Sequence, residues 1–219
     1  MRSKFVMLSS PTSNYFTVEK RMLNSFLWRT ITLLLLFFGL VTPSLAGEPT
    51  DNIKKTTDKM ITILNDPVLK NNVAARRKML RATLNERFDW EEMAKRSLAG
   101  HWERLSEEEK KEFVPLFTDL LENTYMNRIE NYSGDKVSYD DEKVKGYYSL
   151  VKVTIFTDRQ VEIPVAYKMM KKGAEWIIYD VSIEGVSLVK NYQQQFDSVI
   201  LSSSYQGLVE KLKEKVAKN

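Results

Sequence analysis

Apolar positions along this chain repeat at two periods. They recur every three or four residues between about 49 and 130, every second residue between about 136 and 183, and at the longer period again from about 188 to 217. The longer period is typical of amphipathic helices, and the shorter one of strands that bury one face. The pattern therefore predicts helices, then a sheet, then helices again.

Four helices are predicted before the sheet. The first begins at Pro49 and ends at Asn65-Asp66-Pro67, the second covers about 72–87, and Asp89 and Ser106 cap the third and fourth. The fourth helix is the longest and carries a wide apolar stripe, which contains Phe113, Leu116, Phe117, Leu120, Leu121, Tyr125 and Ile129. Pro115 lies inside it, so we expect a kink or a break near 111–115.

Four strands are predicted, at 136–143, 147–157, 160–170 and 174–183. The turns at 157–159 and 171–173 are too short for a crossover helix, so the sheet is expected to be antiparallel. Pro164 cannot donate to a ladder, which places the third strand near an edge or a bulge. The second strand has apolar residues on both faces, which predicts a sheet covered on two sides.

The period changes within residues 179–196, which read Y-D-V-S-I-E-G-V-S-L-V-K-N-Y-Q-Q-Q-F. Alternation stops at Glu184-Gly185, and apolar residues then recur at helical spacing from Leu188 through Tyr192 to Phe196. A strand is therefore predicted to meet a helix at Val186.

This segment resembles the MlaC family, also called the toluene-tolerance family, whose members carry phospholipids between the two membranes of a bacterial envelope. Other similar segments are Phe88-Asp89 with Met93-Ala94, His101-Trp102, Leu105-Ser106 and residues 120–134. Gln193 departs from the family, in which arginine is common at this position. The resemblance covers nearly all of residues 47–219. It implies an α+β fold in which an antiparallel, four-stranded curved sheet is wrapped by N-terminal and C-terminal helices around an apolar cavity.

Residues 1–46 have the pattern of a cleaved signal peptide. Basic residues, the last of them Arg29, precede an uncharged run at 30–41, and Ser44-Leu45-Ala46 supplies the small residues that cleavage needs. A run of ~12 residues rises only ~18 Å as a helix, too little to cross a hydrocarbon core of ~30 Å. We therefore expect one lipid-binding domain, residues 47–219, in the periplasm.

Removing that segment changes the charge balance. The chain has 33 Lys and Arg against 29 Asp and Glu, but residues 1–46 hold five of the basic residues and one of the acidic ones, which leaves 28 of each. A balanced mature chain gives no argument for nucleic-acid binding. The absence of cysteine excludes disulfides, cysteine nucleophiles and a cysteine-linked lipid anchor.

Motifs for common enzyme chemistry are missing from the sequence. His101 is the only histidine and is expected to be a hydrogen-bonded structural residue. There is no H-E-x-x-H, no phosphate-binding G-x-x-x-x-G-K-[ST] and no G-x-S-x-G. We therefore expect a protein that is not an enzyme, with no metal and no cofactor apart from phospholipid as cargo.

The predicted lipid-binding residues come from three places. They are Val181, Ile183, Val186 and Leu188 at the strand-to-helix junction with Tyr192 beyond it, Phe117, Leu121 and Tyr125 on the long helix, and Val153 and Ile155 on the sheet. Val186→Glu is expected to place an unpaired carboxylate among the acyl chains and so to reduce bound lipid. The alternative is that these residues fill one core, because a core and a pocket wall use the same residue types.

The resemblance implies a periplasmic phospholipid carrier. It would shuttle lipid between outer- and inner-membrane complexes of an ABC-type transport system and maintain outer-membrane lipid asymmetry. Its partners would be an inner-membrane ABC lipid transporter with a substrate-capturing periplasmic subunit, and an outer-membrane lipoprotein complex. Two alternatives stay open: an envelope enzyme that acts on a hydrophobic substrate through a carboxylate such as Asp180 or Glu184, and an adaptor with a dry core.

Overall fold

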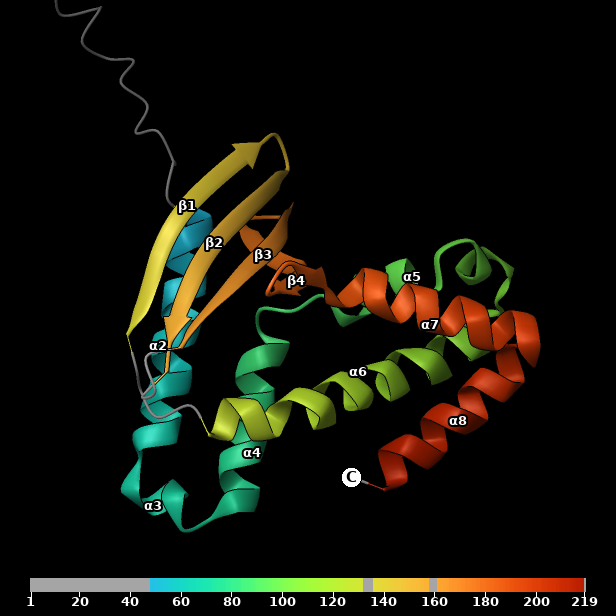
Figure 1. Ribbon diagram of the computed structural model, residues 1–219, viewed down its shortest axis with the longest axis horizontal. Coiled ribbons are helices and arrows are strands. Elements are labelled where there is room, and N and C mark those ends of the chain that lie inside the picture. The colour runs from blue at the N-terminus through green and yellow to red at the C-terminus, as the bar shows by residue number, and fades with distance from the viewer. Residues whose placement is uncertain (1–47, 132–135, 158–160, 219) are drawn as a thin grey trace, which may run out of the picture. The chain divides into compact units, whose positions relative to one another are not determined.

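The structure is a computed structural model that describes residues 48–131, 136–157 and 161–218. The predicted signal peptide lies outside the described residues. The alternating segments form an antiparallel sheet in the order β1-β2-β3-β4-β5 (Figure 1). Its strands are β1 (Val137–Lys145), β2 (Tyr148–Phe156), β3 (Glu162–Lys172), β4 (Glu175–Ile183) and β5 (Val186–Ser187).

Short turns explain why neighbouring strands are antiparallel. Gly146, Gly173 and Gly185 have positive φ in the turns that end β1, β3 and β4, and Glu184 shares this conformation with φ 51°. Two successive residues with positive φ are typical of a tight hairpin turn. The predicted α+β fold and antiparallel sheet are confirmed, and the two-residue β5 adds a fifth strand to the four predicted.

Pro164 lies near the start of a central strand, so its predicted position at an edge or a bulge was wrong. β3 pairs with β2 on one side and β4 on the other, and the bulge in the β3–β4 ladder lies on β4, where Tyr179 is the extra residue opposite Lys168 and Met169. The ladder with β4 ends at Val165, beyond which the Pro164 carbonyl accepts a hydrogen bond from the Glu184 amide at 2.8 Å. In a strand, the N–H and C=O groups of one residue face the same neighbouring strand. The N–H that Pro164 lacks would therefore face β4, where regular pairing has already ended, so its absence leaves no ladder hydrogen bond unmade.

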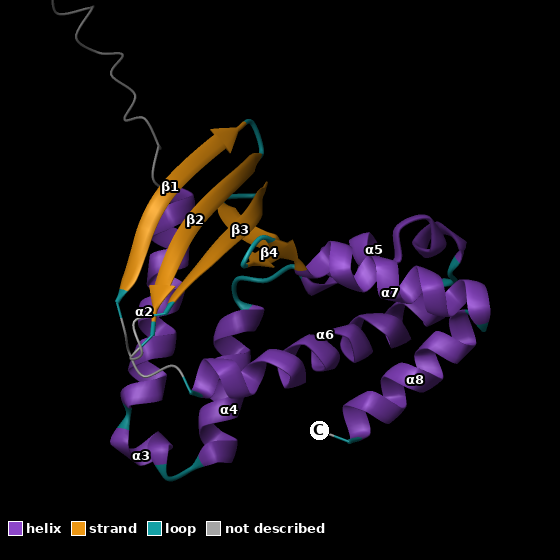
Figure 2. Ribbon diagram, in the orientation of Figure 1, coloured by secondary structure: helices purple, strands orange, loops and turns teal. Residues whose placement is uncertain are grey.

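Helices precede and follow the sheet in the sequence, and in space the first described helix lies along the sheet while the last two helices lie beyond β4 (Figure 2). They are α2 (Glu48–Asn65), α3 (Pro67–Lys70), α4 (Val73–Asn85), α5 (Trp90–Leu98), the 3-10 helix η1 (Ala99–Arg104), α6 (Glu107–Glu130), α7 (Leu188–Ser202) and α8 (Tyr205–Ala217). Asp89 caps α5, and Ser106 with Glu109 forms a capping box at α6, as predicted. No helix in the described part of the chain is both long and apolar enough to cross a membrane.

α6 is continuous through Pro115, so of the predicted kink or break near 111–115 the break does not occur, and the kink stays a prediction. Phe113 and Phe117, on either side of the proline, are fully buried, and their rings stack with centroids 6.0 Å apart. A proline inside a helix costs about 3 kcal/mol or more. Burial of these two aromatic side chains offsets that cost and keeps the helix intact.

Two main hydrophobic cores lie on either side of the strand-to-helix junction. The helical core joins α5, α6, α7 and α8, and its central aromatic residues are Phe113, Phe117, Tyr192 and Phe196. The sheet core lies on the inner face of the sheet, where Ile53 of α2 packs against strand residues such as Val151 and Ile178. In Figure 1, α2 follows the sheet while α5, α7 and α8 group beyond β4, so α6 extends from one core toward the other.

The outer face of the sheet carries none of the described helices (Figure 1), so the prediction of a sheet covered on both sides was wrong. On β2, Val151 and Val153 face the core and are buried, whereas Leu150 and Phe156 on the opposite face are only half-buried, with Lys152 exposed between them. Large side chains on one face of a sheet shield one another across neighbouring strands. Apolar residues on that face therefore do not require a second covering layer.

Asp180 on β4 links the sheet to α7 through hydrogen bonds. Its carboxylate accepts hydrogen bonds from Lys168 Nζ at 2.8 Å, from Ser187 Oγ at 2.7 Å and from the Val189 amide at 3.2 Å. Only 4% of the Asp180 side chain is exposed. The three donors belong to β3, β5 and the first turn of α7, so one buried carboxylate determines how the strand-to-helix junction is built.

Candidate functional site

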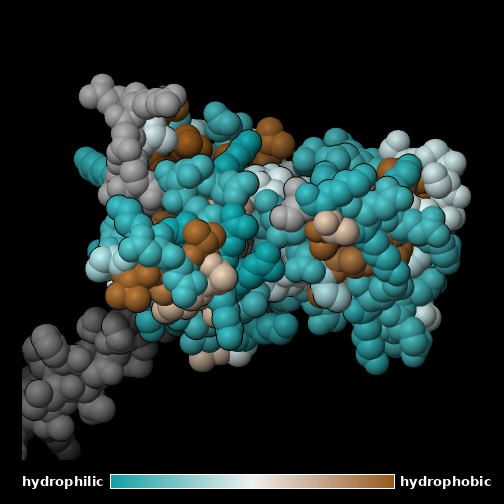
Figure 3. Space-filling view, turned by 90° about the horizontal axis from the view of Figure 1, so that it is seen from below, coloured by the Kyte–Doolittle hydropathy of each residue, from teal (hydrophilic) through white to brown (hydrophobic). Residues whose placement is uncertain are grey.

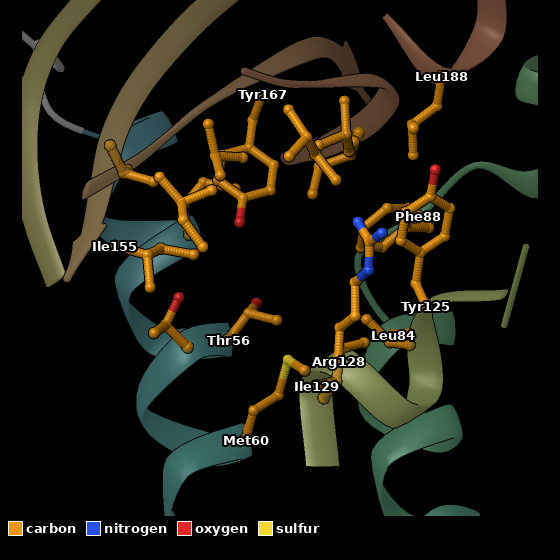
Figure 4. A pocket seen from close by; sticks show the side chains of 18 of the residues that line it. Thr56, Met60, Leu84, Phe88, Tyr125, Arg128, Ile129, Ile155, Tyr167 and Leu188 are labelled. Carbon is orange, nitrogen blue, oxygen red and sulfur yellow. The ribbon is translucent and has the colours of Figure 1, made fainter. Parts of the chain in front are cut away.

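A cavity of about 760 Å³ lies between the inner face of the sheet and the helices α2, α4 and α6. This volume falls within the ~300–1,000 Å³ range of typical ligand pockets. Figure 4 shows side chains from the sheet, from α2 and from α6 around one central space. The face of the molecule seen in Figure 3 is mostly hydrophilic, with hydrophobic residues gathered in smaller patches.

The sheet forms one wall of the cavity because alternate strand residues point to the same face. On β2 these residues are Val153 and Ile155, and on β3 they are Ile163, Val165 and Tyr167. β4 contributes apolar residues to the same wall, namely Ile178, Val181 and Ile183. All of these except Tyr167 are purely aliphatic, so this wall offers van der Waals contact and few hydrogen bonds.

Helices form the opposite wall through residues three or four positions apart. α2 contributes Ile53, Thr56, Thr57, Met60, Ile61 and Leu64, and α6 contributes Leu121, Glu122, Tyr125, Arg128 and Ile129. Leu188 lines the space at the start of α7, Phe88 lines it from the segment between α4 and α5, and Trp90 lines it at the start of α5. The lining is thus mostly apolar, with a few polar and charged side chains on the helices.

Most of the predicted lipid-binding residues lie on the wall of this one cavity. They are Val153, Ile155, Val181, Ile183, Leu188, Leu121 and Tyr125. The structure thus brings together residues that are up to 67 positions apart in the sequence, from Leu121 to Leu188. That these side chains contact a lipid stays a prediction.

Phe117 and Tyr192 do not line the cavity, so their predicted placement was wrong. Both are buried in the helical core, where their rings meet edge to face with centroids 5.9 Å apart. A helix of 24 residues is ~36 Å long, which is enough to cross from one core to the other. Phe117 is therefore on the half of α6 that packs against α7, and Leu121, one turn later, is among the first α6 residues at the cavity.

Val186 also lies outside the cavity, and 57% of it is exposed. It pairs with Ile183 across the tight turn, but β5 ends one residue later, where α7 begins. Its predicted placement in the pocket was therefore wrong, because the edge of the sheet at β5 faces solvent. An acidic side chain at this position would stay hydrated.

The sequence reasoning missed the contribution of α2 and the two charged α6 residues, Glu122 and Arg128. The apolar stripe of α2 was visible, but its periodicity does not show that the facing space is hollow. Charged residues of an amphipathic helix usually lie on its solvated face. No pattern in the sequence separated these two from ordinary surface charges.

Glu122 is a buried acid on the helical wall. Its Oε2 atom pairs with Arg81 Nη1 at 2.8 Å, and its Oε1 atom is buried without a hydrogen-bond partner among the described residues. Burial raises the pKa of Glu122 more than the neighbouring Arg81 lowers it. The raised pKa makes the negative charge on this wall easier to neutralise.

A second, polar cavity of about 550 Å³ lies beside η1 and α7. His101 lines it, and its Nε2 atom makes a 2.8 Å hydrogen bond with Asp197 Oδ1. This hydrogen bond is what we expected of a structural histidine. Within the ranges that the structure describes, no three or more His, Cys, Asp or Glu side chains gather as they would around a metal ion.

Comparisons with known proteins agree with this architecture. The family model described as "MlaC protein" matches residues 54–214. The intermembrane phospholipid transport system binding protein MlaC of Haemophilus influenzae is 24% identical over 196 residues, covering 85% of this chain and 92% of that protein. The toluene tolerance protein ttg2D of Pseudomonas putida is 26% identical over 176 residues, covering 78% of this chain and 81% of that protein.

A solved structure has the same fold. It is the phospholipid-binding protein from Ralstonia solanacearum in complex with a phospholipid, which superposes with a TM-score of 0.72 at 23% identity. The match covers 78% of this chain and 98% of that chain. Since the family model spans well over half of the sequence, this chain belongs to the MlaC family.

Proposed function

We propose that this protein binds a phospholipid by enclosing its acyl chains in the cavity between the sheet and α2, α4 and α6. The observation that carries the proposal is the cavity itself, about 760 Å³ with walls that are mostly aliphatic and aromatic. Two acyl chains with ~30 methylenes have a gross transfer cost of ~24 kcal/mol into water, at ~0.8 kcal/mol each. An apolar enclosure removes most of that cost, and the head group stays hydrated.

The relatives support a transport role for the bound lipid. The Haemophilus protein is named as a binding protein of an intermembrane phospholipid transport system, and the Ralstonia structure contains a phospholipid. We propose that this chain likewise carries phospholipid between outer- and inner-membrane complexes of an ABC-type system, which would maintain outer-membrane lipid asymmetry. On this proposal an inner-membrane ABC transporter and an outer-membrane lipoprotein complex are its partners.

Such a carrier must work in the periplasm, and the first 46 residues have the pattern of an export signal. We therefore propose that residues 47–219 form the mature domain. The protein recovered from the periplasm is expected to begin at Gly47, which N-terminal sequencing measures. Recovery of the full-length chain, with residues 1–46 still attached, would contradict this assignment.

The enzyme alternative required a reactive carboxylate in the cavity, such as Asp180 or Glu184. Asp180 is not on the cavity wall, and its oxygens are occupied by three donors that hold the strand-to-helix junction together. Glu184 does line the cavity, but it is exposed on a tight turn. The Glu184 side chain is therefore surrounded by water, whereas enzymes usually place a reactive carboxylate in a site that excludes water.

The carrier and a dry-core adaptor differ in what the purified protein contains. We expect an organic extract of periplasmic protein, purified without detergent, to contain phospholipid in an amount comparable with that of the protein, as measured by mass spectrometry. Protein that has been unfolded, washed free of lipid and refolded serves as the blank. An extract of the native protein with no more phospholipid than this blank would favour the adaptor.

A further inference from the structure

Arg128 is an unusual member of the cavity wall. It lies in the last turn of α6, and Figure 4 shows its side chain directed from that helix into the space between α2, the sheet and Phe88. Of the described residues that line the cavity, it is the only one with a positive charge. It is also exposed, so it lies where the cavity opens to solvent.

The acidic residues nearest to Arg128 on α6 are already paired with other arginines. Glu122 pairs with Arg81 at 2.8 Å. Glu130 binds both Arg76 and Arg77, at 3.1 and 2.8 Å, and the hydrogen bond from Arg77 is the main reason that its pKa is lowered. These carboxylates join α4 to α6, so within the described part of the chain neither of them pairs with Arg128.

Within the described ranges, no carboxylate forms an ion pair with Arg128, not even Glu184, which lines the same cavity. The contact that Arg128 makes is with the ring of Tyr125, with the guanidinium carbon 5.7 Å from the ring centroid. A cation near the C-terminus of a helix is favoured by the helix dipole, by about 0.3–1 kcal/mol. The dipole does not explain why the side chain is directed into the cavity.

A guanidinium group presents five N–H donors in a planar fork that fits two oxygens of a phosphate. Here the fork is held at the opening of an apolar cavity, and the aromatic ring of Tyr125 restricts its position. Resting on the proposed function, we propose that Arg128 binds the phosphodiester of the phospholipid whose acyl chains fill the cavity. Because phospholipids with different head-group alcohols share this phosphodiester, the contact selects for the phosphate and does not discriminate between those alcohols.

Two lipids with identical acyl chains test the proposal: phosphatidylglycerol, which has the phosphodiester, and diacylglycerol, which lacks it. Each is titrated into delipidated wild-type protein, Arg128→Gln and Arg128→Lys. We expect Arg128→Gln to bind phosphatidylglycerol about tenfold more weakly, because a charge-assisted hydrogen bond is lost. Its affinity for diacylglycerol should change little, and Arg128→Lys should restore part of the phosphatidylglycerol affinity because the charge returns without the planar fork.

Arg104→Gln is the matched control, because Arg104 is exposed and lines the other, polar cavity. It should bind both lipids as the wild type does, and thermal melting should show that all variants are folded. Unchanged phosphatidylglycerol affinity in Arg128→Gln, or equal losses for both lipids, would overturn the role of Arg128 while leaving the proposed function intact. Failure of the wild-type protein to bind either lipid would overturn the proposed function and this inference together.

Discussion

Ile183→Glu is expected to remove nearly all phospholipid from the purified protein, whereas Val186→Glu should leave the lipid content unchanged. The two residues face each other in the β4–β5 ladder, so the same change is made at directly paired positions. Ile183 lines the cavity, while Val186 lies outside it and is 57% exposed. A carboxylate among acyl chains is unpaired and costs several kcal/mol, and ~3 kcal/mol already weakens binding about a hundredfold.

Mass spectrometry of organic extracts measures this difference for both variants and the wild type, and circular dichroism confirms that each variant is folded. Equal lipid contents in folded Ile183→Glu and wild-type protein would show that acyl chains do not occupy this cavity. Loss of lipid from Val186→Glu instead would mean that chains lie along the exposed edge at β5. The pair of variants therefore tests the position of the pocket as well as its existence.

Asp180→Asn is expected to lower the free energy of unfolding by about 2–4 kcal/mol, because one buried acceptor and a negative charge are lost next to three donors. The expected loss is below that for a fully buried ion pair, since the partner Lys168 has 35% of its side chain exposed. Lys168, Ser187 and the Val189 amide would compete for the single oxygen that remains. The strand-to-helix junction at β5 and α7 should loosen first.

Urea denaturation of delipidated protein measures this change without the stabilisation that a bound ligand adds. Asp141→Asn is the matched control: its carboxylate is 3.7 Å from Lys143 and Lys152 and 40% exposed, so we expect a change of at most ~0.5 kcal/mol. If both variants unfold at the wild-type midpoint, Asp180 does not hold the junction together. A stable Asp180→Asn protein that loses turnover of a lipid substrate would instead revive the enzyme alternative.

Much of the secondary structure could be predicted because its causes are local. The cap at Ser106 forms with a residue three positions away, and the alternation along Ser149, Val151 and Val153 is a property of one strand. The turn at Gly185 requires positive φ, which glycine adopts without strain. Elements determined by contacts between neighbours in the sequence therefore agree with the structure, including the change from strand to helix near Val186.

The cavity was less predictable because periodicity shows which face of an element is buried and not what lies opposite that face. Phe117 and Leu121 belong to one apolar stripe of α6, yet the first packs against aromatic rings of α7 and the second lines the cavity. Val186 is apolar and lies close in sequence to Ile183 and Leu188, which line the cavity, but the sheet ends beside it and leaves it exposed. These outcomes depend on partners far away in the sequence.

By itself, the sequence determined the order of helices and strands, the antiparallel pairing imposed by short turns, the caps of α5 and α6 and the resemblance to the MlaC family. The tertiary structure alone decided that α6 extends from the helical core to the cavity, that α2 forms a wall of this cavity and that Arg128 is directed into it. The physical reason is that short-range forces act between neighbours in the chain, whereas a cavity is space left by the packing of distant segments. Identical aliphatic side chains can fill a core or line a cavity.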